Sequence, residues 1–352
     1  MGREPPDAKH GQKHLLIWYI ISRCPPSTSL RLTWGMHPWR SSMRNHGAIT
    51  AVAFAFTIIG SSTSATALDA PDGPLVTTEW LEANLGDENL RLLEVSVEPG
   101  VFERGHIEGA QNVVWHTDLV DPVKRDIASR NEFEALVRKL GIDDQKTVVL
   151  YGDNNNWFAA WGAWVFDTYG IDVKLLDGGR KKWEAENLPL STRVASIPET
   201  SIELPERNEA LRARLTQVLD VVNGAEEATI VDIRSADEYS GRIFAPEGSQ
   251  ELTIRAGHVP GAINVPWGTA VAEDGTFKPA EELRRIYAEK GIDGSKPIIV
   301  YCRIGERSSH TWFLLGKILG YDVRNYDGSW TEYGNSVGSP IVNVSNTVWT
   351  GN

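Results

Sequence analysis

The chain has 352 residues, of which 41% are hydrophobic, and its 47 acidic and 35 basic side chains give a formal net charge of −12. This length suffices for two domains, each with a buried core. Two cysteines, Cys24 and Cys302, are too few for a disulfide scaffold or a four-cysteine zinc site. The acidic balance excludes general binding to phosphate backbones, so we expect no nucleic-acid partner.

The amino-terminal region differs in charge from the rest. Its first 67 residues carry seven basic and two acidic side chains, so the remaining 285 residues carry a net charge of −17. From Met43, a basic start precedes an apolar run from Ala48 to Ile59 and small residues that end at Ala67. This pattern predicts a signal peptide over residues 43–67 and an exported protein. The apolar run is short for a membrane span, so we expect no membrane association of the mature form, with an uncleaved anchor as the alternative.

Residues 1–42 fit an export signal less well than the segment after them. We interpret them as a non-native or untranslated extension, with translation starting at Met43. Cys24 would then be absent from the mature protein, and Cys302 would be its one thiol.

The remaining sequence contains an internal repeat. The pattern GHxxGAxNV occurs at 105–113 and 257–265, and two further pairs of segments follow at offsets of 150 residues: KTVVLYG with KPIIVYC, and VKLLDGG with VRNYDGS. Repeats of this kind predict tandem copies of one domain. We place the copies at 72–190 and 215–342, with a linker over 191–214.

Each copy alternates short apolar runs with helical stretches. In the first, strands are predicted over 90–95, 111–115, 147–152 and 173–178, and a helix capped by Ser129 and Glu132 ends before Gly141. In the second, strands are predicted over 229–234, 262–266, 298–302 and 323–328, and a helix runs from Pro279 to Gly291. The alternation predicts an α/β fold with a parallel sheet in each copy and helices on both of its faces.

The two copies differ in a reactive residue at one loop. Gly152 follows the third strand of the first copy, and Cys302 occupies the same place in the second. Ligands of parallel sheets bind at this end of the strands. A helix is expected to begin near Ser308, so the thiol would lie between a buried strand and a helix amino terminus.

The surroundings of Cys302 favour a reactive thiolate. A free thiol has a pKa of about 8.5, and helix amino termini and nearby cations lower it. Arg303 and Arg307 are close in sequence, and Gly305 permits a tight loop whose amides point at the sulfur. An inert buried cysteine is the alternative. A cysteine phosphatase, with its Cys-x5-Arg spacing, is a minor alternative because Ser308 stands where its arginine is needed.

These features resemble the two-domain rhodanese family, and within it the actinobacterial type of thiosulfate sulfurtransferase. The similarity covers roughly residues 72–342 and includes NNNWFAA, DPVKRD, DGGRKKW, YDGSWTEYG and CRIGERSSHTWF. It implies two rhodanese-like domains, the first of them non-catalytic. It also implies a Cys302 persulfide that carries sulfur from thiosulfate to cyanide or to a small or protein thiol. No metal, nucleotide or organic cofactor is implied.

The loop matches the family pattern associated with thiosulfate, Cys-Arg-x-Gly-x-[Arg/Thr]. The pattern Cys-Gly-Ser-Gly-Val-Thr is associated instead with 3-mercaptopyruvate, which stays an alternative donor. This chain has Ile304 and Glu238 where animal enzymes of the family carry cations. Donor binding should therefore depend on Arg303 and Arg307, with Gly305 shaping the loop.

Other residues are expected in weaker roles. Arg255, beside the second GHxxGA turn, is a lesser candidate for binding the donor. Asp232 and Arg234 end a strand near the site and would either brace the loop through Arg303 or form an ordinary ion pair. Supporting positions in the loop are assigned to Ile304, Glu306 and Ser308. A third possible function is a persulfide carrier or interaction module that delivers sulfur to a partner protein.

Overall fold

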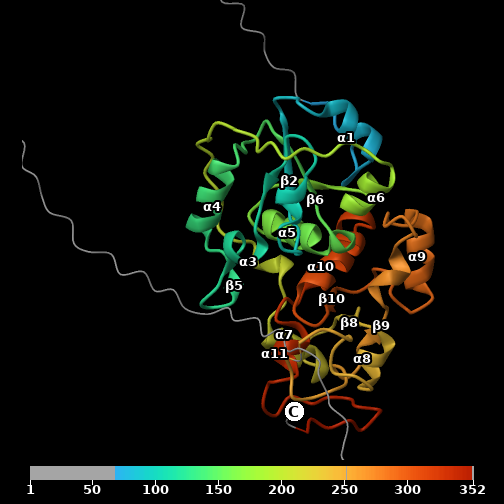
Figure 1. Ribbon diagram of the computed structural model, residues 1–352. Helices are drawn as coiled ribbons and strands as arrows, with labels where there is room; N and C mark the ends of the chain where they lie inside the picture. Colours follow the sequence, from blue (N-terminus) through green and yellow to red (C-terminus); the bar gives the residue numbers. More distant parts are fainter. Residues whose placement is uncertain (1–67, 251, 351–352) are drawn as a thin grey trace, which may run out of the picture. The chain divides into compact units, whose positions relative to one another are not determined.

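The computed structural model of this protein describes residues 68–250 and 252–350. The predicted extension, the signal peptide and Cys24 lie outside these residues and stay predictions. Figure 1 shows the first half of the described chain in blue to green and the second half in yellow to red. The two halves pack into one unit.

The first half contains a parallel sheet with the strand order β1-β7-β6-β2-β3. Its strands are β1 (Leu75–Val76), β2 (Leu90–Glu94), β3 (Gln111–Asn112), β6 (Thr147–Tyr151) and β7 (Val173–Leu176). A separate antiparallel hairpin consists of β4 (Val120–Asp121) and β5 (Asp126–Ile127). The helices are α1 (Thr78–Asn84), α2 (Val101–Arg104), α3 (Trp115–Asp118), α4 (Arg130–Lys139), the 3₁₀ turn η1 (Asn154–Asn156), α5 (Trp157–Thr168) and α6 (Gly179–Ala185).

The second half contains a parallel sheet with the order β11-β10-β8-β9. Its strands are β8 (Thr229–Asp232), β9 (Ile263–Asn264), β10 (Ile298–Tyr301) and β11 (Val323–Asn325). The helical elements are η2 (Glu209–Leu211) before the sheet, α7 (Leu215–Val222), α8 (Ala236–Ser240), η3 (Trp267–Ala270), α9 (Ala280–Ala288), α10 (Glu306–Trp312) with its π-helical continuation η4 (Phe313–Ile318), and α11 (Ser329–Tyr333).

Local sequence signals explain where several elements begin and end. Ser129 and Glu132 form the predicted capping box of α4, and Gly141 beyond its end has a φ of 69°. Strands β3 and β9 are shorter than predicted because the chain turns at Val114 and Pro266, the N-caps of α3 and η3. The capping prediction is confirmed, and the strand ends were placed too late.

Both sheets are covered on two faces, as predicted. Neighbouring residues of the central strand β6, Val149 and Leu150, belong to two different buried clusters, and so do Ile299 and Val300 of β10. Side chains that alternate in this way require packing on both faces. One cluster is shared between the halves, because α5 packs directly against α10 (Figure 1). The halves therefore share part of one core.

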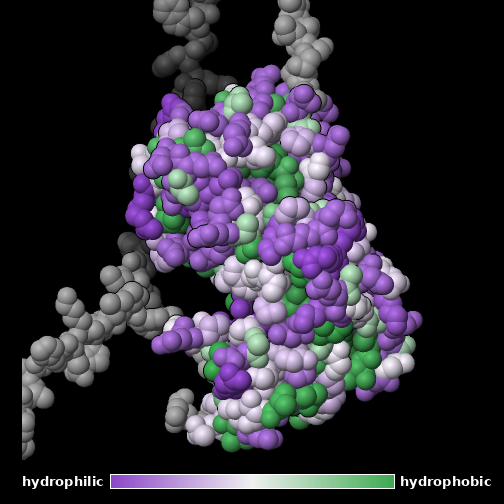
Figure 2. Space-filling view, turned by 90° about the vertical axis from the view of Figure 1, so that its right-hand side faces the viewer, coloured by the Kyte–Doolittle hydropathy of each residue, from purple (hydrophilic) through white to green (hydrophobic). Residues whose placement is uncertain are grey.

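One face of the described part of the protein is mainly polar. On the face in Figure 2, hydrophilic side chains predominate and hydrophobic ones form small separate patches. Among the helices of the described residues, none is long and apolar enough to cross a membrane.

Candidate active site

Cys302 lies directly after β10, and its side chain is fully buried. The backbone N–H of Gly305 donates a hydrogen bond to Cys302 Sγ at 3.1 Å. Gly305 has a φ of 107°, and a Cβ at this position would lie 2.4 Å from the carbonyl oxygen of Asp327. Only glycine fits here. Helix α10 begins at Glu306, two residues earlier than predicted. The loop is therefore a tight turn, and its Gly305 amide is hydrogen-bonded to the Cys302 sulfur.

Ser329, which was not singled out from the sequence, places a hydroxyl beside the thiol. Its Oγ accepts the N–H of Cys302 at 3.1 Å and lies 3.9 Å from Sγ. The next residues clamp the loop: Trp330 N donates to the carbonyl of Cys302, and the N–H and hydroxyl of Thr331 donate to that of Arg303. The sequence does contain a signal for Ser329, because the second copy of the repeat has DGS where the first copy has DGG.

The first half has no room for a nucleophile at the equivalent place. A Cβ at Gly152 would lie 2.2 Å from the carbonyl oxygen of Val95. The N–H of Gly152 donates to Asn156 Oδ1 at 2.9 Å, and Gly179, the counterpart of Ser329, leaves space for that amide. In the first half the Asn156 amide therefore takes the place of the Ser329 hydroxyl, and the backbone of Val95 fills the place of the thiol.

Arg307 is the cation that the structure places beside the thiol. Burial lowers its pKa, but the charges of Cys302 and Glu238 outweigh burial, so its pKa is above the ordinary value. Its Nη2 donates to Glu238 Oε1 at 3.0 Å, and its guanidinium lies 5.8 Å from the centre of the Trp157 ring. In the sequence, Glu238 stood out only as an acid at a position where animal enzymes of the family carry a cation. Here it is the counter-ion of Arg307.

Arg303 extends along the loop toward a neighbouring segment. Its Nη2 donates to the carbonyl oxygen of Gln250 at 2.6 Å, while its Nε is buried without a hydrogen-bond partner. An unpaired buried N–H is costly, and an anion would satisfy it. Arg303 therefore retains a donor for a negatively charged ligand.

Arg255 does not contribute a free cation. Its guanidinium donates four hydrogen bonds to backbone carbonyls, those of Tyr333, Gly334, Ser336 and Ser339. These bonds hold the segment after α11 against the GHxxGA turn. The structure speaks against a role of Arg255 in binding the donor, because four of its five N–H groups already bond to backbone carbonyls.

Asp232 and Arg234 pair with each other and not with Arg303. Arg234 Nη2 lies 2.6 Å from Asp232 Oδ2 and also donates to the carbonyl of Gly257, and the Tyr301 hydroxyl donates to Asp232 at 2.7 Å. Of the two alternatives in the sequence analysis, the ordinary ion pair is correct.

The first half contains a matching buried group. Tyr151 donates to Glu94, and Arg180 binds both Glu94 and the carbonyl of Gly105. Because this arrangement occurs in the half without a nucleophile, we assign it to the fold.

The supporting loop residues have distinct surroundings. Ser308 lies in the first turn of α10, with its Oγ 2.7 Å from both the carbonyl oxygen of Gly305 and Asn325 Oδ1. Ile304 and Glu306 line a pocket of about 370 Å³ between the two halves. One side of the loop therefore faces the thiol, and the other side faces this pocket.

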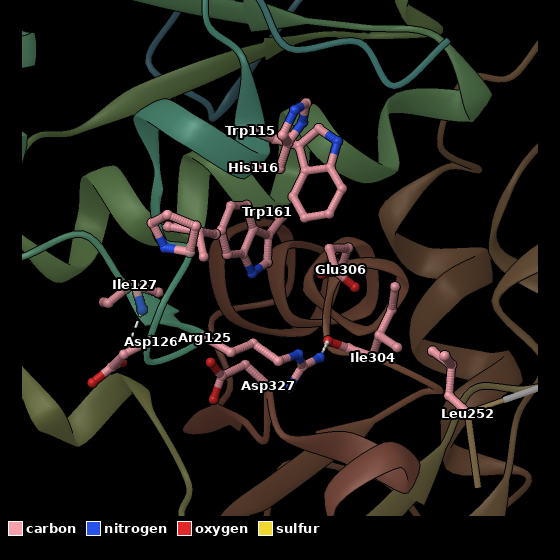
Figure 3. Close-up of a pocket in the computed structure, with 12 residues that line it drawn as sticks. Trp115, His116, Arg125, Asp126, Ile127, Trp161, Leu252, Ile304, Glu306 and Asp327 are labelled. Atoms are coloured by element: carbon pink, nitrogen blue, oxygen red, sulfur yellow. Dashed lines mark hydrogen bonds between the residues drawn. The ribbon is translucent and has the colours of Figure 1, made fainter. Parts of the chain in front are cut away.

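The pocket combines aromatic walls with one unpaired acid. Trp115 and Trp161 form part of its wall, and Glu306 points into it (Figure 3). The Glu306 side chain is buried, and its Oε2 has no hydrogen-bond partner. Burial raises the pKa of Glu306 to about 8. Its carboxyl is therefore mostly protonated at neutral pH and can donate a hydrogen bond to a ligand.

This geometry fits covalent catalysis at sulfur. A buried thiol accepts an amide hydrogen bond beside the Arg307 cation, which would stabilise a thiolate, and the unpaired Nε of Arg303 in the same loop could donate to a bound anion. Within residues 68–250 and 252–350, no group of three or more His, Cys, Asp or Glu side chains is arranged to hold a metal ion.

Comparison with known families decides the classification. The model of the rhodanese-like domain matches residues 77–186 and 215–336. The chain belongs to the rhodanese family. Its two rhodanese domains confirm the predicted family and fold.

Relatives of this rhodanese cover most of its described length. A protein of Mycolicibacterium smegmatis named "Putative thiosulfate sulfurtransferase" is 52% identical over 270 residues, which cover 76% of this chain and 96% of that protein. The "Sulfur carrier protein TtuD" of Thermus thermophilus is 50% identical over 272 residues, 76% of this chain and 95% of that one. The crystal structure of an anaerobic ergothioneine biosynthesis enzyme from Chlorobium limicola shares the fold, with a TM-score of 0.66, 24% identity and coverage of 77% and 70%.

Proposed function

We propose that this rhodanese is a thiosulfate sulfurtransferase that transfers the outer sulfur of thiosulfate to cyanide or a thiol. The observation that carries the proposal is the hydrogen bond from the Gly305 N–H to Cys302 Sγ. Arg307 lies beside the thiol, and the same loop carries the unpaired Nε of Arg303. Two rhodanese-like domains and the names of the relatives support sulfurtransferase activity. The loop pattern with Arg303 in place of glycine favours thiosulfate over 3-mercaptopyruvate.

In the first half-reaction, the Cys302 thiolate attacks the outer sulfur of thiosulfate. A bond forms between Sγ and that sulfur, the sulfur–sulfur bond of the donor breaks, and sulfite leaves with the electron pair. Arg303 and Arg307 hold the dianion and stabilise the departing sulfite, while the loop amides stabilise the sulfur anion. The product is a Cys302 persulfide.

In the second half-reaction, an acceptor attacks the outer persulfide sulfur, and the bond to Sγ breaks. The electron pair of the broken bond returns to Sγ, which regenerates the Cys302 thiolate, and the acceptor leaves with the transferred sulfur.

A persulfide carrier that serves a protein acceptor is the second candidate. The observation that favours it is the 50% identity to the "Sulfur carrier protein TtuD". A carrier would form the persulfide and turn over small acceptors slowly. Turnover with cyanide, compared with crosslinking to proteins of the exported fraction, separates the two functions.

Mass spectrometry of the intact protein tests the persulfide. Incubation with thiosulfate should add the mass of one sulfur atom, and the Cys302→Ser variant should gain nothing. Ser329→Ala is a matched control that removes the neighbouring hydroxyl and keeps the thiol. No gain in the wild type, or an equal gain in Cys302→Ser, would reject the proposal.

We further propose that the protein is exported, on the signal-peptide pattern that ends at Ala67. Amino-terminal sequencing of the exported form tests this. A mature chain that begins near Leu68 supports it, and a chain that keeps residues before Met43 contradicts it.

A further inference from the structure

One peptide group links the thiol of the second half to a residue of the first. The N–H of the peptide between Ile304 and Gly305 donates to Cys302 Sγ at 3.1 Å. The carbonyl oxygen of the same peptide accepts a hydrogen bond from Arg125 Nη2 at 3.0 Å, drawn in Figure 3. Because a peptide group is planar, the two bonds fix the direction of one rigid unit.

Arg125 is held in place by its own hairpin. It lies between β4 and β5 with a φ of 54°, and its N–H donates to the carbonyl of Asp121 at 2.8 Å. The Asp121 carboxylate also accepts the N–H groups of Val123 and Lys124. These bonds close the turn from which the arginine extends.

The hairpin is also tied to the catalytic half next to the loop. Asp126, which follows Arg125, pairs with Arg212, and Arg212 binds both carboxylate oxygens of Asp327 at 2.8 Å. The backbone of Asp327 lies directly against Gly305. These contacts set the position of the hairpin backbone relative to the loop, and the exposed Arg125 side chain reaches from there to the Ile304 carbonyl.

We propose that Arg125, from the half without a nucleophile, is a positioning residue for the Cys302 loop. Its guanidinium holds the Ile304 carbonyl outward, so that the N–H on the other side of the peptide points at Sγ. A cationic donor on the carbonyl also polarises the peptide and strengthens its N–H as a donor. The first domain thereby takes part in activating the thiol without touching the substrate.

This inference concerns the state of the thiol and rests on the proposed function only for its consequence. Loss of the contact lets the peptide rotate, which removes a hydrogen bond from the thiolate that attacks thiosulfate. The expected effect is the value of one ordinary hydrogen bond, about fivefold in the thiolate population. The rate of sulfite release at acid pH should fall by a similar factor.

The test is a titration of ultraviolet thiolate absorbance in Arg125→Gln, measured against a Cys302→Ser background for each protein. We expect the fraction of Cys302 present as thiolate at acid pH to fall about fivefold, with the same full absorbance at alkaline pH. Lys124→Gln is the matched control, because it removes the same charge from the same hairpin, and the Lys124 ammonium pairs with Asp121 at 3.2 Å and not with the Cys302 loop.

Two outcomes would overturn the inference. If Arg125→Gln titrates like the wild type, even with lowered thermal stability, Arg125 serves only the domain interface. If Lys124→Gln shifts the titration equally, net charge and not the hydrogen bond is responsible. The titration needs no sulfur donor, so a shift in Arg125→Gln without any persulfide from thiosulfate would uphold the positioning role and reject the donor.

Discussion

Replacement of the buried acid by Glu306→Gln should change how stability depends on pH. Burial raises the pKa of Glu306 from 4.5 to about 8, so the folded protein binds more protons than the unfolded chain between these values. The stability from the protonated carboxyl is complete below about pH 4.5 and is lost as the pH rises toward 8. Glutamine keeps the shape of the neutral acid and does not ionise, so the variant escapes this loss.

The size of the effect follows from the same shift. The difference between pH 4.5 and 8 corresponds to at most about 5 kcal/mol, and water that enters the pocket on ionisation reduces it, so we expect about 2 to 5 kcal/mol. Urea unfolding of wild type and variant at pH 5 and 8.5 measures it. The variant should gain stability relative to wild type only at the higher pH.

The matched control is Glu281→Gln, which changes a first-turn glutamate of α9 whose side chain is 92% exposed. It should alter stability little at either pH, because its carboxyl is in water in both states. A difference between Glu306→Gln and wild type that is the same at both pH values would refute the argument. Relative stabilisation of the wild type with rising pH would refute it as well.

Three further substitutions test the site. Gly305→Ala places a Cβ 2.4 Å from the carbonyl oxygen of Asp327, so the loop must move, and sulfite release in a single turnover should slow at least tenfold. An unchanged rate would show that the site tolerates this movement of the loop. Glu238→Gln releases Arg307 from its counter-ion and should lower the KM for thiosulfate about fivefold, and an unchanged or higher KM would remove Arg307 from donor binding. His310→Phe should keep kcat/KM within about twofold and raise the free energy of unfolding by about 1 kcal/mol. His310 lies in α10, where burial lowers its pKa to about 3 and its Nδ1 has no hydrogen-bond partner, so a tenfold loss of activity would instead indicate a role as a base.

The features that could be predicted from the sequence are local ones. The capping box of Ser129 lies within four residues, and the tight turn at Gly305 follows from a glycine between a buried strand and a helix. The alignment of Gly152 with Cys302 singled out the candidate nucleophile because the repeat brings equivalent positions together. In each case the interacting groups are neighbours in sequence or are related by a fixed offset.

The features that were missed depend on contacts distant in sequence. Arg125 reaches a loop 179 residues away, and Glu238 meets Arg307 at a separation of 69 residues. Arg255 was assigned to the donor because a cation beside a loop looks free until the carbonyls around it are known. A residue type shows which bonds it can make, and only the fold shows which of them are already used.

The most direct test of the central claim is the release of sulfite in the absence of an acceptor. If Cys302 takes sulfur from thiosulfate in a separate half-reaction, mixing enzyme and thiosulfate alone should release sulfite stoichiometric with the enzyme and then stop. The Cys302→Ser variant should release none. Sulfite that appears only when cyanide or a thiol is also present would show that no persulfide forms on the enzyme, and would contradict the account.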